Sequence, residues 1–153
     1  MNARSFELAD SLAEHGRYRS AFRVFLRAGQ RGDTSVFGRL GYAYDVGQGV
    51  RKSRRKALYW YRRALAAGEA VAAHNIGTVY RDSGHSLRAA AWFRRAVALG
   101  LHGSNLELGQ LLLGGLGQPA DALACFRAIG SKDCDAVVEA AKTWSAVTEG
   151  ILA

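Results

Sequence analysis

The sequence of 153 residues contains a single proline, Pro119. Proline interrupts helices, so its scarcity favours a helical chain. No apolar run approaches the ~20 residues that a membrane-spanning helix needs, which argues against an integral membrane protein. The two cysteines, Cys125 and Cys134, form neither a disulfide framework nor a zinc-binding pattern. Cys125 falls on an apolar stripe and is expected to be a small buried residue.

The chain also lacks the features of a targeting signal, and its basic residues outnumber its acidic ones. Residues 1–7 have neither the basic segment nor the apolar stretch of a secretory signal, so a cytoplasmic location is expected. Lysine and arginine number 21 against 13 acidic residues, which gives a formal net charge of +8. This excess favours acidic partners and carries no information about the fold.

No catalytic, metal-binding or cofactor-binding constellation stands out. The sequence has four histidines: His15, His74, His85 and His102. They do not occur at the spacing of metal ligands together with a third ligand. No glycine-rich loop is followed by the lysine and the serine or threonine that a phosphate-binding loop requires. We therefore predict no catalytic residues, no metal and no cofactor, and we expect that the protein is not an enzyme.

A repeated pattern runs through the chain instead. The stretch at 56–64, KALYWYRRA, recurs as RAAAWFRRA at 88–96, with fainter copies at 20–28 and 121–127. Its first alanines, at 21, 57, 89 and 122, are 36, 32 and 33 residues apart. A second element of the form [LI]-[AG]-x-x-[LY] precedes each copy, at 8–12, 40–44, 76–80 and 108–112. The chain is thus four copies of a two-part unit.

Both parts of the unit carry apolar or small residues at positions i, i+3, i+4 and i+7, which is one face of an α-helix. The pattern predicts helices near 3–15, 18–28, 34–46, 54–67, 70–82, 87–99, 103–113 and 119–129, and a ninth near 133–149. Glycine after a helix readily takes the left-handed conformation that ends it. The expected helix-ending glycines are Gly16, Gly29, Gly47, Gly68, Gly84, Gly100, Gly114 and Gly130. Ser53 and Ser86 are expected N-caps.

The third copy, with Gly77, Tyr80, Ala89 and Phe93, resembles the tetratricopeptide repeat. The second copy has an insertion at 47–52 before K-A-x-x-W-Y and resembles the Sel-one-like repeat, a tetratricopeptide relative. The resemblance implies an all-α, right-handed α-solenoid of four helical hairpins with a C-terminal capping helix. It implies one domain, 1–153, with repeats at about 3–31, 33–68, 69–100 and 101–130 and a capping helix at about 133–149.

The repeated small residues have a physical reason. Gly41, Gly77 and Gly109 should let paired helices approach closely, while aromatic side chains fill the space between hairpins. Among the aromatic residues, Trp60, Tyr61, Trp92 and Phe93 stand at packing positions, which favours a core role over base stacking. Val137, Ala141, Trp144 and Thr148 form an apolar stripe that is expected to seal the last hairpin.

In tetratricopeptide-like proteins the upstream helix of each hairpin lines a concave groove that holds a peptide or helix. The resemblance therefore implies a protein–protein interaction module, a scaffold or adaptor, whose partner is another protein. Helical geometry places one set of side chains off the packing stripe and on this groove. The predicted partner-binding residues are Arg39, Tyr42, Asp45, His74, Asn75, Thr78, Arg81 and Gln110.

A basic patch offers an alternative function. It consists of Arg51, Lys52, Arg54, Arg55, Arg62 and Arg63, and Lys56 lies in the same stretch. The patch could bind nucleic acid or another anionic partner with strong salt dependence, although a solvated outer face is the simpler interpretation and nucleic acid is disfavoured. Self-association through the ends of the stack remains a further alternative.

Overall fold

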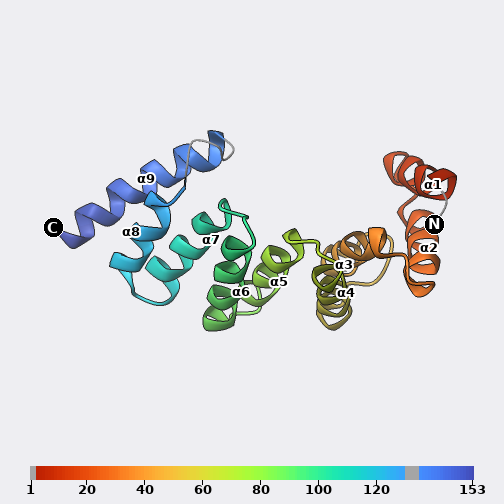
Figure 1. The fold of residues 1–153 in the computed structure, drawn as a ribbon, viewed down its shortest axis with the longest axis horizontal. Coiled ribbons are helices and arrows are strands. Elements are labelled where there is room, and N and C mark those ends of the chain that lie inside the picture. The colour runs from red at the N-terminus through yellow and green to blue at the C-terminus, as the bar shows by residue number, and fades with distance from the viewer. Residues whose placement is uncertain (1–2, 130–134) are drawn as a thin grey trace. The chain divides into compact units, whose positions relative to one another are not determined.

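The structure is a computed structural model that describes residues 3–129 and 135–153. Within these residues the regular structure is helical throughout (Figure 1). The α-helices are α1 (Ala3–Glu14), α2 (Tyr18–Gln30), α3 (Phe37–Val46), α4 (Arg54–Ala66), α5 (Val71–Arg81), α6 (Ser86–Ala98), α7 (Ser104–Gln110), α8 (Pro119–Arg127) and α9 (Asp135–Leu152). A 3₁₀ turn, η1 (Thr34–Val36), precedes α3, and a π turn, η2 (Leu111–Gly115), follows α7. The predicted all-α fold is confirmed.

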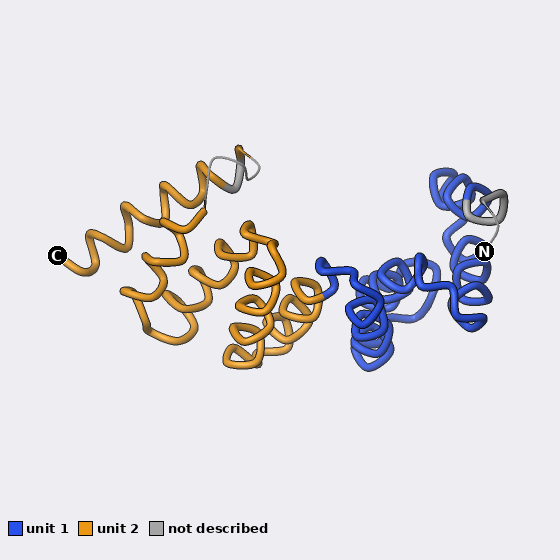
Figure 2. The backbone as a smooth tube through the Cα atoms, viewed as in Figure 1, with its two compact units in different colours: residues 1–72 blue, residues 73–153 orange. Residues whose placement is uncertain are grey.

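The helices fall into two compact units, residues 1–72 and 73–153 (Figure 2). In the first unit α1 packs on α2 and α3 packs on α4. In the second unit α7 packs on both α6 and α8, and α8 packs on α9. Sequence neighbours are thus neighbours in space, as expected for helical hairpins in a repeat protein.

Small residues allow the helices of each hairpin to approach closely, as the sequence predicts. A Cβ atom added to Gly77 of α5 would lie 2.7 Å from the Phe93 ring of α6. Gly41 of α3 faces Tyr61 of α4 at similarly close range, and Gly109 of α7 faces Phe126 of α8 in the same way. Contacts below 3.0 Å are essentially never seen for real Cβ atoms, so these three positions tolerate glycine alone without a shift of the ring.

The C-terminal helix covers the last hairpin. Ala141 and Thr148 of α9 are buried, and the Trp144 ring stacks on Phe126 of α8 with 6.1 Å between ring centroids. The Thr148 hydroxyl donates to the Trp144 carbonyl oxygen at 2.6 Å, which satisfies a polar group inside an apolar contact. These contacts agree with a sealing role. The predicted first residues of this helix, 133–134, and the side chain of Val137 lie outside the described residues.

Two of the predicted helix-ending glycines are wrong. Gly29 lies inside α2, where an added Cβ would be 2.6 Å from Leu40, so this glycine serves close approach and Gly32 (φ 90°) ends the helix. Gly114 lies inside η2, and Gly117 (φ 63°) makes the left-handed turn. Gly130 lies outside the described residues. A sequence does not by itself separate a glycine that ends a helix from one that admits a neighbour.

The two predicted serine caps are corrected as well. Ser53 occupies the N-cap position of α4, but its side chain makes no capping hydrogen bond. Ser86 is the first residue of α6, and His85 takes the cap position. Helix α6 thus starts one residue earlier than predicted, after the left-handed turn at Gly84 (φ 75°).

Candidate partner-binding site

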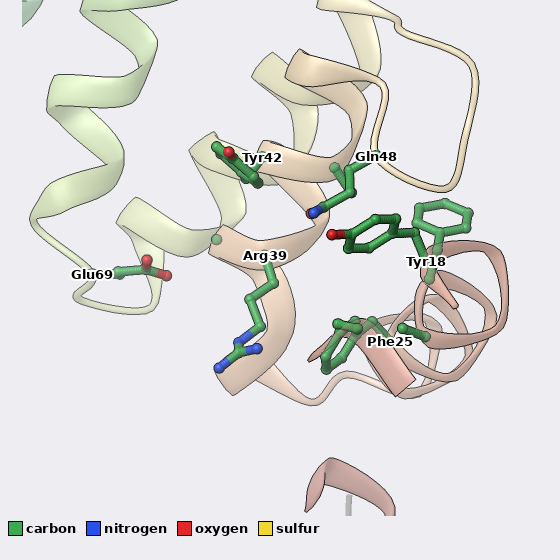
Figure 3. Close-up of a pocket in the computed structure, with 11 residues that line it drawn as sticks. Tyr18, Phe25, Arg39, Tyr42, Gln48 and Glu69 are labelled. Carbon is green, nitrogen blue, oxygen red and sulfur yellow. The ribbon is translucent and has the colours of Figure 1, made fainter. Parts of the chain in front are cut away.

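A hollow of about 370 Å³ opens in the first unit, between α2 and α3. The residues around it include Tyr18, Phe25, Arg39, Tyr42, Gln48 and Glu69 (Figure 3). They come from two helices, from the turn after α3 and from the turn after α4. Its size is within the range of about 300–1,000 Å³ that is typical of ligand-binding pockets.

The floor of the hollow is aromatic. Phe22 and Phe25 of α2 are each 8 % exposed and form part of the lining. Tyr18 stands at the start of the same helix, and Figure 3 shows its hydroxyl directed toward α3. Tyr42 on α3 leaves half of its surface exposed, 51 %, although it borders this apolar surface. A half-exposed tyrosine offers both an apolar ring and a hydrogen-bonding hydroxyl to a partner.

The loop between α3 and α4 forms one side of the hollow. Gly49 lies against the Tyr18 carbonyl so closely that no Cβ would fit, and its φ of 72° is a conformation that favours glycine. This contact fixes the loop on the start of α2 and brings Gln48 to the rim. The insertion at 47–52 thus has a structural effect: it adds an amide to the hollow.

Charged side chains of both signs complete the hollow. Arg39 forms an ion pair with Asp10 of α1, and its guanidinium carbon lies 5.4 Å from the centroid of the Phe25 ring. The Glu69 carboxylate lies over Gly38 in the first turn of α3, where the helix dipole favours negative charge. Arg39 is 47 % exposed and Asp10 is 31 % exposed. An ion pair this exposed contributes about 0–1 kcal/mol, so a carboxylate of a partner could compete for it at small cost.

In the second unit, the predicted residues make contacts within the protein. The Nδ1 atom of His74 lies 2.9 Å from the Oγ atom of the buried Ser104, and its ring packs against Phe93 with 5.4 Å between centroids. Burial lowers the pKa of His74, while the Glu107 charge opposes that shift. The Thr78 hydroxyl donates to the His74 carbonyl at 3.3 Å.

The second predicted arginine is also held by the protein. Arg81 forms ion pairs with Glu107 of α7 and with its neighbour Asp82, the latter at 3.0 Å. Asn75 of α5 and Gln110 of α7 are partly exposed. A polar surface therefore runs over α5 and α7, and its charges are largely matched.

The structure brings some of the predicted residues together and leaves others apart. Arg39 and Tyr42 share the hollow of the first unit. Asp45 does not line this hollow. Its negative charge instead acts on Tyr61: burial is the main cause of the raised pKa of Tyr61, and the charge of Asp45 is the second. Sequence reasoning missed the contributions of Tyr18, Gln48 and Glu69. The glycine pair in the inserted loop, Gly47 and Gly49, signals a turn at Gln48, but it does not indicate Glu69, which lies after α4.

The basic patch is largely exposed. Arg51 and Lys52 lie in the loop before α4, and the other members lie on α4. Arg63 is partly buried, because its guanidinium carbon stacks 4.2 Å from the centroid of the Phe37 ring.

Cys125 of α8 is half-buried, and burial raises the pKa of its thiol, which makes it a weak nucleophile. Cys134 lies outside the described residues.

Helical hairpins joined by close glycine contacts, with apolar faces stacked in sequence order, define an α-solenoid of the tetratricopeptide class. The Sel1 repeat family matches residues 39–69, 70–101 and 103–127, more than half of the chain. The chain belongs to the Sel1 repeat family. The first hairpin, α1 with α2, lies outside these matches, in agreement with its weaker pattern.

Two crystal structures are similar to the chain. A Sel1 repeat protein from Oxalobacter formigenes is 27 % identical, with a TM-score of 0.64 over 80 % of this chain and 53 % of the other. A protective antigen of uropathogenic Escherichia coli that displays an SLR fold is 28 % identical, with a TM-score of 0.65 over 81 % of this chain. The chain spans about half the length of the first protein and 29 % of the second. No curated protein matches the chain.

The family membership gives a general function. Sel1 repeats are in general protein–protein interaction modules, and proteins of this family are typically non-catalytic scaffolds. Among the described residues, none of the helices has the length and apolar character required to cross a membrane.

Proposed function

We propose that the chain binds a segment of a partner protein in the hollow between α2 and α3. The observation that carries the proposal is Tyr42, which is half exposed at the edge of an apolar hollow floored by Phe22 and Phe25. An apolar side chain of the partner enters the hollow, and its backbone lies across α3. Aromatic residues at the centre of an interface, ringed by polar groups, carry much of the binding energy in protein complexes.

The polar groups around the hollow support a peptide as the occupant. Gln48 can both donate to and accept from a peptide backbone, and Arg39 can pair with a carboxylate. Helical-repeat proteins recognise extended or helical segments by such combinations of side-chain pockets and backbone contacts. The partly exposed Asn75, Thr78 and Gln110 provide a second polar surface that we propose as a contact of its own in the second unit.

A displayed peptide library tests the proposal. Peptides selected on the wild-type chain are measured against Tyr42→Ser and against a control, Leu87→Ser, whose leucine is 75 % exposed on α6 and does not line the hollow. We expect Tyr42→Ser to weaken binding by about tenfold or more, since an interface hot spot contributes about 2 kcal/mol. Selected peptides that bind Tyr42→Ser as tightly as wild type would rule out this hollow.

A further inference from the structure

A second hollow in the first unit has a volume of about 520 Å³. Helix α4 contributes Lys56, Tyr59, Trp60 and Arg63, spaced at i, i+3, i+4 and i+7, so they share one face of the helix. Helix α2 contributes Leu26 and Gln30, and α3 contributes Tyr44. None of these residues lines the hollow around Tyr42, so the two surfaces are separate.

The charge of this hollow has one sign. None of the described residues that line it is acidic, and two are cationic, Lys56 and Arg63. Three further members of the basic patch, Arg54, Arg55 and Arg62, are exposed on the same helix. Positive charges gathered around an apolar hollow raise the local concentration of anionic partners and speed their association.

Aromatic rings hold the two cations in place. The Lys56 ammonium lies 5.2 Å from the centroid of the Tyr44 ring. The Arg63 guanidinium carbon lies 4.2 Å from the centroid of Phe37 and 5.0 Å from that of Trp60. Tyr44, Phe37 and Trp60 are at most 6 % exposed, so their rings are fixed by the core. A cation fixed on a buried ring loses less side-chain entropy when it binds an anion than a freely rotating one.

We infer that this hollow binds an acidic segment of a partner protein, in which carboxylates flank an apolar side chain. Lys56 and Arg63 are seven residues apart on α4, which places them about 10 Å apart along the helix axis. Carboxylates two helical turns apart on a helical segment can reach both cations, and a side chain one turn from each carboxylate lies between them on the same face. The apolar side chain between them fills the hollow against Leu26, Tyr59 and Trp60.

The arrangement favours an acidic protein over nucleic acid. Each strand of duplex DNA presents one phosphate per about 3.4 Å of helix axis and no apolar side chain. The hollow instead separates its two cations by an apolar and aromatic surface, with Tyr59 54 % exposed between them. This inference does not depend on the hollow around Tyr42, because the two sites share none of their lining residues.

Fluorescence anisotropy with a defined probe tests the inference. The probe is a short fluorescein-labelled peptide of glutamates with one central leucine, and it is compared with the same peptide without leucine and with duplex DNA. The test variant is Lys56→Gln with Arg63→Gln. The matched control is Arg51→Gln with Lys52→Gln, which removes the same charge from the exposed loop before α4. Circular dichroism confirms that both variants remain helical.

We expect the leucine peptide to bind to the wild-type chain and to bind the test variant about tenfold or more weakly. The control variant should lose about threefold or less in affinity, because its charges lie at the rim of the site. Equal losses in the two variants would show a diffuse electrostatic attraction and overturn the inference. Equal binding of the peptide without leucine would remove the role of the hollow. DNA that binds more tightly than the peptide would replace the acidic segment with nucleic acid, and no binding of any probe would refute the site.

Discussion

At the scale of single residues, several polar side chains predicted to face a partner are already engaged within the protein. Arg39 is paired with Asp10, and Arg81 is paired with Glu107. Replacing these arginines would therefore change contacts between helices as well as any contact with a partner. Tyr42 is a cleaner probe of binding, because half of its surface is exposed at the hollow.

His74 allows a prediction of pH dependence. Burial lowers the pKa of His74 in the folded protein below its ordinary value of 6.5, so the unfolded chain binds the proton more readily. The contribution of neutral His74 to stability is complete above pH 6.5 and is lost as the pH falls through the lowered pKa of His74 in the folded protein. We expect the free energy of unfolding, measured with urea, to fall as the pH drops below 6.5, and His74→Gln to reduce that fall.

A second histidine provides the control for this measurement. His102 is exposed in the turn before α7, and His102→Gln is the control for replacing an exposed histidine. Glu107 and Arg81 both act on His74 in the structure, so they are left unchanged in these variants. If His74→Gln and wild type lose stability in parallel, burial of neutral His74 does not contribute to stability.

At the scale of helices and hairpins, the close approach at glycine determines the packing. Gly77→Ala places a Cβ atom 2.7 Å from the Phe93 ring, whose side chain is fully buried. Since buried rings have little room to shift, we expect a loss of about 1–3 kcal/mol in the free energy of unfolding. Thermal and urea unfolding of the variant measure this loss.

Gly150→Ala is the matched control for Gly77→Ala. Gly150 lies in α9, and an added Cβ there meets nothing within 4 Å. Alanine in a helix is favoured over glycine by about 0.5–1 kcal/mol, so the control should be neutral or stabilising. A Gly77→Ala protein as stable as the control would mean that α5 and α6 are not held together at this glycine.

The elements themselves could be predicted from the sequence because the repeat imposes a helical period on nearly every segment. Most of the described helices begin and end within about two residues of the predicted bounds. The exceptions are the start of α3, which η1 precedes, the end of α7, which continues as η2, and the end of α9, which extends to Leu152. The hollow around Tyr42 could not be predicted, since Gln48 and Glu69 reach it from loops. Loop positions depend on contacts such as Gly49 with Tyr18, which have no periodic pattern.

At the scale of the whole molecule, repetition and family membership agree. Each unit contains stacked hairpins whose apolar faces are buried by their neighbours, and repeats of this kind present extended surfaces for other proteins. The single domain at 1–153, the cytoplasmic location and self-association stay predictions. The two hollows described here both belong to the first unit, which makes that unit the place to look for partners.

The central claim is that the hollow between α2 and α3 receives a partner protein. Its most direct test is photo-crosslinking in the native host, with a benzophenone amino acid in place of Tyr42. The control carries it in place of Leu87, which is 75 % exposed on α6. The account predicts a protein adduct of defined mass from the Tyr42 position, suppressed by a peptide selected on this hollow, and none of that mass from the Leu87 position. The same adducts from both positions, or an adduct that the peptide does not suppress, would contradict it.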